Sequence, residues 1–367
     1  MISIHKGIII VRMKVALVHD DLVQWGGAER VLLGLSEAFP EAPIYTSVYD
    51  KKNPILNQLF GSKKIITSFI QNIPGWRNYY KALLPLYPVA FEQFDFSDYD
   101  LVISQTTRFA KAVLTKPQTK HICYCHTPPR FLWNFSGEKV PKAFPYMKYL
   151  RRFDLVSAKR VDFWIGGSNN ASQRIKNIYG AKSSVIHPFV DLERFSGAET
   201  FEGGYLLVVS RLTGYKRVDL AVKAANILKM PLKIVGTGPM ETGLRMTAGP
   251  TVEFLGNVSD DLVVKLLAGC KALIVAGEED FGLTPLEAQV LGKPVVAFGK
   301  GGALESIIPG ETGYFFEEQS AQSLIDALNR LDKSGFDRLK CISNAEKFSK
   351  ENFLLKFKRK IHDIQPF

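Results

Sequence analysis

The sequence has few cysteines and no long uninterrupted run of apolar residues. Four cysteines among 367 residues are too scattered for a disulfide scaffold, which fits a reducing compartment. The best early apolar stretch, 7–18, is broken by Arg12 and Lys14, whereas a membrane-spanning helix needs roughly 20 apolar residues. No small-residue cleavage site follows this stretch, so a secretion signal is not indicated. We therefore expect a cytoplasmic protein whose patterned sequence begins after residue 12.

The sequence also lacks complete signatures of a zinc site, a dinucleotide fingerprint or a P-loop. His121-Ile-Cys-Tyr-Cys-His126 has a C-x-C spacing that is unusual for zinc, and no second ligand pair stands elsewhere, so a buried strand is favoured there. Gly236-Thr-Gly238 lacks the third glycine of the fingerprint, and no Walker lysine follows it. These absences argue against zinc-dependent and P-loop chemistry.

Positive charge is in excess, but only in one half of the chain. Residues 1–190 hold 25 Lys and Arg against 13 Asp and Glu, whereas residues 191–367 hold 22 against 23. The net charge of +11 therefore comes entirely from the first half. This asymmetry predicts that the first half faces an anionic partner, with a phospholipid surface, a lipid diphosphate and nucleic acid all open.

The second half alternates short apolar runs with amphipathic stretches. Buried parallel strands are predicted at 205–210, 232–235, 252–255, 272–276 and 294–298. Helical spacing occurs between them at 218–228, 260–268 and 285–291. The alternation predicts a parallel sheet with helices on both faces, whose ligands bind beyond the carboxyl ends of the strands.

The first half repeats this pattern with longer insertions. Its strand candidates are 15–19, 44–48, 101–104, 121–124, 163–166 and 185–187. Two aromatic and basic insertions lie at 63–87 and 131–160. A boundary is predicted near His187-Pro-Phe-Val-Asp191, where a strand ends in proline. We therefore expect domains at 1–190 and 191–345, and a C-terminal helix at 346–367 for which a crossing back onto the first domain is open.

The strongest candidate site is the segment Glu279-Asp-Phe-Gly-Leu-Thr-Pro-Leu-Glu287, which follows a predicted strand. The backbone at 281–284 can present free N–H groups where a helix begins, and helix N-termini attract phosphate. The carboxylates at both ends can accept hydrogen bonds from sugar and ribose hydroxyls. Two acids at this spacing also occur by chance, so a helix start with solvated acids is the competing interpretation.

A second candidate site, Ser210-Arg211-Leu-Thr-Gly-Tyr-Lys216-Arg217, follows the first predicted strand of the same sheet. Arg211 can bind a diphosphate through its planar fork and Lys216 as a point charge. A solvated loop is the competing interpretation. Because both segments lie at carboxyl ends of strands in one sheet, we predict that they form one anion site.

Several short segments occur in a characteristic order along the chain. They are Gly26-Gly27-Ala28-Glu29, His126-Thr-Pro, Ser210-Arg211 with Lys216, Val235-Gly-Thr-Gly-Pro239, Phe254-Leu255-Gly256, the segment 279–287 and Gly292-Lys-Pro-Val295. Together they resemble glycosyltransferase family 4, a large retaining family with the GT-B fold. Tyr124-Cys-His-Thr-Pro-Pro-Arg130 and Tyr99-Asp-Leu-Val-Ile-Ser104 look particularly like bacterial mannosyltransferases of O-antigen and exopolysaccharide assembly.

The resemblance implies an α/β GT-B fold, in which two Rossmann-like domains face each other across a cleft, acceptor side first and donor side second. It implies that Arg211 and Lys216 bind the donor diphosphate and act in catalysis. Glu279 would hold sugar hydroxyls and His126 would sit over the reacting carbon, although a satisfied histidine at a strand end is the competing interpretation. The donor-binding positions implied are Gly26, Gly27, Gly236, Leu255, Gly256, Phe281, Gly282, Leu283, Thr284 and Glu287.

The implied function is retaining transfer of a hexose from a nucleotide sugar, with GDP-mannose favoured, to a glycan or polyprenyl-diphosphate-linked glycan. No metal is expected, because protein cations can neutralise the leaving diphosphate. Asp98-x-Asp100 has the form of a metal-binding pair of the other glycosyltransferase fold, but it precedes a predicted strand and marks its start. Glu305 is expected to cap or pair locally.

The remaining expectations concern partners and rival functions. The stretch 63–81 mixes cations with aromatics, which predicts peripheral binding to the anionic inner face of the cytoplasmic membrane, with packing on its own domain as the alternative. A nucleotide-sugar epimerase or a phosphorylase of similar fold is a rival function. A basic nucleic-acid-binding protein is another, but no recognised docking motif supports it.

Overall fold

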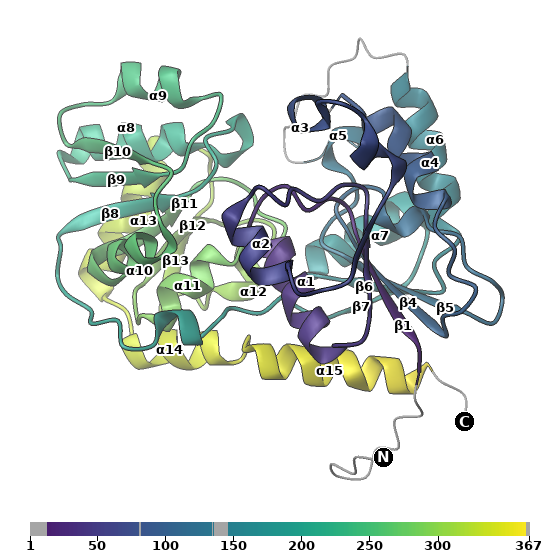
Figure 1. The fold of residues 1–367 in the computed structure, drawn as a ribbon. Coiled ribbons are helices and arrows are strands. Elements are labelled where there is room, and N and C mark those ends of the chain that lie inside the picture. The colour runs from purple at the N-terminus through teal and green to yellow at the C-terminus, as the bar shows by residue number, and fades with distance from the viewer. Residues whose placement is uncertain (1–12, 81, 134, 136–145, 365–367) are drawn as a thin grey trace. The chain divides into compact units, whose positions relative to one another are not determined.

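The computed structural model describes residues 13–80, 82–133, 135 and 146–364, and the start of the chain at 1–12 lies outside them. Two compact units make up the chain, and each is built on a parallel β-sheet with helices (Figure 1). Of the described residues, 13–80, 82–133, 146–167 and 171–185 belong to the first unit. The second unit holds 135, 168–170 and 186–364, so the main division falls between 185 and 186.

The first unit holds a sheet of seven parallel strands in the order β3-β2-β1-β4-β5-β6-β7. Its strands are β1 (Val15–His19), β2 (Ile44–Thr46), β3 (Ile65–Thr67), β4 (Leu101–Thr106), β5 (Lys120–Cys125), β6 (Phe163–Gly166) and β7 (Ser183–Val185). The helices between them are α1 (Gly27–Ala38), α2 (Pro54–Phe60), α3 (Trp76–Tyr79), α4 (Tyr87–Glu92), α5 (Arg130–Trp133), α6 (Tyr146–Ala158) and α7 (Asn169–Tyr179). Short 3-10 turns lie at η1 (Phe69–Asn72), η2 (Leu84–Leu86) and η3 (Ala110–Ala112).

The second unit holds a sheet of six parallel strands in the order β10-β9-β8-β11-β12-β13. Its strands are β8 (Tyr205–Val209), β9 (Leu232–Val235), β10 (Val252–Gly256), β11 (Cys270–Val275), β12 (Val295–Phe298) and β13 (Gly313–Phe316). The helices are α8 (Val218–Leu228), α9 (Glu241–Thr247), α10 (Asp260–Gly269), α11 (Thr284–Val290), α12 (Ala303–Ser306), α13 (Ala321–Ser334), α14 (Arg338–Glu346) and α15 (Lys350–Asp363), with turns η4 (Glu193–Phe195) and η5 (Gly214–Lys216).

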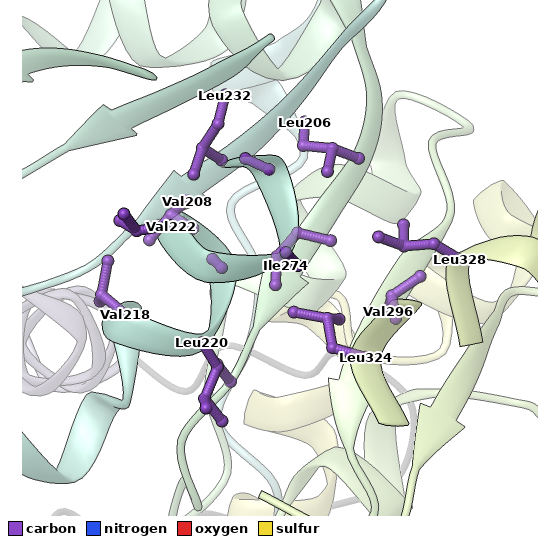
Figure 2. Close-up of a cluster of buried hydrophobic side chains, with 14 of the residues drawn as sticks. Leu206, Val208, Val218, Leu220, Val222, Leu232, Ile274, Val296, Leu324 and Leu328 are labelled. Atoms are coloured by element: carbon purple, nitrogen blue, oxygen red, sulfur yellow. The ribbon is translucent and has the colours of Figure 1, made fainter. Parts of the chain in front are cut away.

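Both faces of the second sheet are buried, as its continuous apolar strands predict. Leu206 and Val208 of β8 pack with α8 and α13 on one face, where Val222 and Leu324 join them (Figure 2). The alternate residue Leu207 packs with α10 and α11 on the other face. Successive strand residues point to opposite faces, so this sheet is sandwiched between two helical layers.

Polar caps fix where several helices of the second unit begin. Ser259 accepts a hydrogen bond from the Leu262 N–H at the start of α10, and Ser320 accepts one from Ser323 at α13. Asp337 caps α14 in the same way. Each cap satisfies an N–H group that has no partner inside its helix, which stabilises the helix by about 1 kcal/mol.

The strand order of each sheet reverses once, and this reversal determines where ligands bind. In local numbering, both sheets follow the Rossmann order 3-2-1-4-5-6, and the first sheet adds a seventh strand. The switch points lie between β1 and β4 and between β8 and β11. The predicted α/β class with two Rossmann-like domains is confirmed.

Every predicted strand is present in the structure with its ends displaced by at most two residues, and two further strands were missed. The strand expected at 185–187 lies two residues earlier, at Ser183–Val185, and ends where the first unit ends. β3 and β13 were missed. β3 lies inside the stretch that was interpreted as an insertion at 63–87. β10 ends with Leu255 and Gly256, so the strand predicted at 252–255 is one residue longer.

Candidate active site

A pocket in the second unit lies at the switch point, at the carboxyl ends of β8 and β11. Ser210 and Lys216 line it from the segment after β8. Glu279, Gly282 and Thr284 line it from the segment after β11. The two segments that were predicted to form one site therefore meet in one pocket.

The charged groups of this pocket are Lys216 and Glu279. The Lys216 ammonium forms a hydrogen-bonded ion pair with Glu279 Oε1, and the two side chains are 15% and 18% exposed. Pairing offsets the cost of removing two charged groups from water. A cation that can bind a phosphate oxygen and a carboxylate that can accept from a hydroxyl thus stand side by side in the lining of the pocket.

Arg211 stands apart from this pair. Its Nη2 atom donates to the Tyr215 hydroxyl at 3.0 Å, and the residue is exposed. The side chain of Tyr215, which belongs to the same segment after β8, is buried, and the Lys216 ammonium lies 5.1 Å from the centre of its ring. The phenol thereby ties Arg211 to the loop that carries Lys216.

The loop 277–284 is held in place from several sides. Phe281 is buried and stacks on His187, with ring centres 5.1 Å apart. The Glu279 carbonyl accepts from the Gly302 N–H at 2.9 Å. Gly282 has a φ of 81°, a left-handed conformation that favours glycine. These contacts fix the backbone on which Glu279 is carried.

The first turn of α11 presents backbone donors next to the pocket. The first hydrogen bond of this helix runs from the Glu287 N–H to the Leu283 carbonyl, at 2.9 Å. The N–H groups of Leu283 and Thr284 precede this bond and have no partner inside the helix. They lie where the sequence predicted donors for a phosphate.

Glu287 follows one turn later on α11 and is already bound to a cation. Arg194 Nη1 donates to Glu287 Oε1 at 2.7 Å, and Arg194 Nη2 lies 3.3 Å from Asp260 Oδ1. Sequence reasoning missed Arg194, because it lies far from Glu287 in the chain and in no recognised motif. The only indication in the sequence was that an arginine without a predicted role lies just after the predicted domain boundary.

The loops after β8, β9 and β10 meet at Gly236. Its N–H donates to the Gly256 carbonyl at 2.7 Å. Its φ is 121°, and a Cβ atom there would lie 1.9 Å from the Ser210 carbonyl oxygen. Only glycine allows this close approach. Gly236 thus lies against the backbone just before Arg211 and is hydrogen-bonded to Gly256, which follows Leu255 at the end of β10.

The candidates of the first unit lie around the start of α1 and the end of β5. Gln105 Nε2 donates to the Ala28 carbonyl and to His126 Nε2, each at 2.6 Å. This amide connects the segment of Gly26 and Gly27 with His126. Because His126 Nε2 accepts in this arrangement, the ring proton is assigned to Nδ1. His126 has a polar partner, as the competing interpretation of a satisfied histidine requires.

An aspartate that the sequence analysis did not single out organises the switch point of the first sheet. Asp20 is buried after β1 and accepts backbone N–H bonds from residues 107–110, at 2.6–2.9 Å. Burial alone would raise the pKa of Asp20. The charges of Arg108 and His19 and the N–H bonds outweigh burial, so the pKa lies below its usual value. The ionised carboxylate thereby fixes the loop after β4.

Three minor interpretations have clear structural outcomes. Cys123 lies buried in β5, and burial raises the pKa of its thiol to about 12, so it is a structural residue as expected. Asp98 and Asp100 are exposed, and Asp100 accepts from the Lys14 N–H just before β4. Glu305 pairs with His187 at 2.7 Å and accepts from the Asn169 N–H at 2.8 Å, so it pairs and caps as expected, but its partners lie 118 and 136 residues away and are not local.

The part of the chain that the structure describes shows no membrane span and no metal cluster. No helix there combines the length and apolar character needed to cross a membrane. Nor do three or more His, Cys, Asp or Glu side chains gather there in a way that could hold a metal ion. Metal independence stays a prediction.

Known proteins similar to this chain cover nearly all of it. The family model described as Glycosyltransferase Family 4 matches residues 25–194, and the one described as Glycosyl transferases group 1 matches residues 190–348. The alpha-1,3/1,6-mannosyltransferase ALG2 of Dictyostelium discoideum is 23% identical, with 94% of this chain and 95% of that protein covered. ALG2 of Debaryomyces hansenii is 24% identical, with 80% and 76% covered.

Solved structures agree in fold across almost the whole chain. Anabaena HepE, solved in complex with UDP, has a TM-score of 0.72 at 18% identity, covering 96% of this chain and 100% of that chain. Sucrose-phosphate synthase of Thermosynechococcus elongatus has a TM-score of 0.74 at 17% identity, covering 96% and 99%. The protein is therefore a glycosyltransferase of the GT-B class. The two family models together match residues 25–348, which confirms the predicted resemblance to glycosyltransferase family 4.

Proposed function

We propose that this glycosyltransferase moves a mannosyl residue from a nucleoside diphosphate donor, with GDP-mannose as the favoured candidate, to a glycan or lipid-linked glycan. The pocket that joins Lys216 and Glu279 at the switch point carries the assignment of the donor site. Mannose as the sugar is supported by the ALG2 relatives, which are alpha-1,3/1,6-mannosyltransferases. UDP in the HepE complex supports a nucleotide as the carrier.

The donor diphosphate is assigned to Lys216, Arg211 and the first turn of α11. Loss of the diphosphate builds negative charge on its oxygens, and fixed donors aimed at that charge lower the barrier. Lys216 supplies a point charge and Arg211 a planar fork. The N–H groups of Leu283 and Thr284 add neutral donors without further ordering.

The sugar and the nucleoside are assigned to the carboxylates and glycine loops. Glu279, with the backbone of Phe281 and Gly282, would accept from and donate to sugar hydroxyls. Glu287 would accept from the ribose. The loop of Gly236 with Leu255 and Gly256 would lie beside the base, while Gly26 and Gly27 would allow the backbone to approach the phosphates.

Transfer is proposed to retain the anomeric configuration. The family resemblance supports this, and no carboxylate nucleophile was evident from the sequence. In front-face attack, the acceptor hydroxyl oxygen forms the new bond to the anomeric carbon as the bond to the diphosphate breaks. The leaving phosphate oxygen takes the acceptor proton. His126 would then position the sugar, and proton NMR showing an inverted linkage would instead make it the base.

An anionic membrane surface is proposed as a peripheral partner of the first unit. Much of the stretch 63–81 packs on its own domain, because Ile70 and Trp76 are buried and Arg77 pairs with Asp50 at 2.6 Å. The proposal is supported by the excess positive charge of the first half of the chain and by the exposed side chains of Phe69 and Tyr79. Lys81 lies outside the described residues. Flotation with anionic and neutral vesicles tests this, and equal recovery would refute it.

Acceptor-dependent release of nucleoside diphosphate tests the proposed activity. Purified protein is incubated with GDP-mannose, GDP-glucose, UDP-glucose or UDP-galactose, with and without a lipid-linked glycan. The expected result is release from GDP-mannose only when the acceptor is present, together with a mannosylated product by mass spectrometry. Release without acceptor, or conversion of the donor sugar to its epimer, would contradict glycosyl transfer.

A further inference from the structure

Arg194 bridges two acidic side chains from different helices of the second unit. It lies in η4, and its Nη1 and Nη2 atoms contact Glu287 on α11 and Asp260 at the start of α10, at 2.7 and 3.3 Å. The Arg194 and Glu287 side chains are 12% and 14% exposed, whereas Asp260 is half exposed. The Arg194–Glu287 contact is thus largely shielded from water, where a charge-assisted bond holds its geometry best.

The arrangement carries a cost that packing alone does not explain. Arg194 Nε is buried with no hydrogen-bond partner in the described part of the chain, and a buried donor left unpaired is unfavourable. Its guanidinium lies 5.2 Å from the centre of the Phe195 ring, which fixes its plane. The Nε donor of this side chain therefore stays unpaired within the described residues, while Nη1 and Nη2 both contact carboxylates.

The geometry leaves one oxygen of Glu287 available. Arg194 occupies Oε1, and no described residue donates a hydrogen bond to Oε2. Thr284, which lines the pocket, lies three residues before Glu287 on α11, so the two share one face of the helix. With one oxygen held by a planar guanidinium, the second can face a hydroxyl at the pocket without first being ordered.

We propose that Arg194 is a positioning residue, which fixes the Glu287 carboxylate so that its free oxygen accepts a hydrogen bond from the donor ribose. This inference rests on the proposed role of Glu287 as the ribose ligand. Arg194 does not bind a phosphate itself, because its charge is already shared between Glu287 and Asp260. Its effect on donor affinity is therefore transmitted through Glu287 alone.

The test measures the dissociation constants of GDP and UDP by calorimetry. The nucleotide that binds more tightly is then compared with its 2′-deoxy and 3′-deoxy forms. The wild type should prefer the ribonucleotide. Arg194→Ala should weaken ribonucleotide binding about tenfold, the lower end of the loss caused at metal sites by removing a group that orients a ligand, and should reduce the preference over the deoxy form. In a Glu287→Ala background, Arg194→Ala should have no further effect.

Controls separate this role from a general loss of structure. Arg245→Ala removes an exposed arginine that pairs with Glu241 on α9, and it should leave both affinities unchanged. Thermal melting monitors folding. Should Arg194→Ala not fold, Arg194→Lys carries the test, because a point charge cannot hold two carboxylates as a fork does. The lysine variant should then show the reduced preference for ribose.

The outcomes distinguish failure of the inference from failure of the proposed site. Suppose the wild type prefers ribose and Glu287→Ala loses the preference, while folded Arg194 variants keep it. The positioning role would then be wrong and the ribose site would stand. An equal loss of ribo and deoxy binding in the Arg194 variants would also overturn it. A wild type without any preference between ribose and deoxyribose would overturn both assignments.

Discussion

Replacing Lys216 by methionine removes the cation of the pocket while preserving most of its volume. In the structure, its ammonium pairs with Glu279, and both side chains are more than four-fifths buried. The low exposure makes a contact to a developing anion stronger than it would be in water. Removing one such donor typically costs about 2.7–4 kcal/mol, so kcat should fall roughly 10²- to 10³-fold.

The substitution also releases Glu279 from its partner, so Glu279→Gln is measured beside it. The assay is acceptor-dependent release of nucleoside diphosphate, with kcat and KM obtained separately. Lys223→Ala is the matched control, because Lys223 pairs with Asp219 at 3.6 Å on the surface of α8 and is 58% exposed. A folded Lys216→Met protein whose kcat lies within threefold of wild type, with the control also unaffected, would refute the proposed role.

Three further predictions concern metal, backbone and pH. Turnover should persist in excess chelator, and its abolition would revive Asp98 and Asp100 as metal ligands. Gly236→Ala should destabilise the protein by at least about 2 kcal/mol in urea unfolding, well beyond Gly310→Ala, which also has a positive φ but meets no neighbouring atom. Burial lowers the pKa of His121 to about 4 from 6.5, so the unfolded chain binds more protons between these values. The free energy of unfolding should therefore fall by up to about 3 kcal/mol between pH 6.5 and a pH below 4. Urea unfolding measured across this range checks the prediction, and the fall should be smaller in His121→Asn.

The buried strands and the donor loops could be predicted because their sequence signals are local. β1, β6 and β9 have the predicted bounds, and α8 does too. Strands covered on both faces are continuously apolar, so their composition alone distinguishes them from the polar loops. The segments of Lys216 and Glu279 could then be brought together by topology, because parallel strands end on the same edge of a sheet.

Partners distant in the chain could not be predicted in the same way. Arg194 and Glu287 are 93 residues apart, and no sequence pattern around either residue indicates that they pair. β3 has only three residues, too few to show a period, and its neighbours have the aromatic and basic composition of an anchor. Trp76, counted as part of that anchor, is a core residue because the insertion supplies its own hydrophobic layer.

The acidic groups of the second unit share an arrangement that bears on how a donor would bind. Glu279 is held by Lys216, Glu287 by Arg194, and Glu305 by His187 and the N–H of Asn169. Burial would raise the pKa of Glu305, but these bonds outweigh it and the pKa lies below its usual value. Each carboxylate is therefore oriented before any nucleotide arrives. Side chains that are already ordered lose little conformational entropy on binding, so more of the interaction energy remains for the transition state.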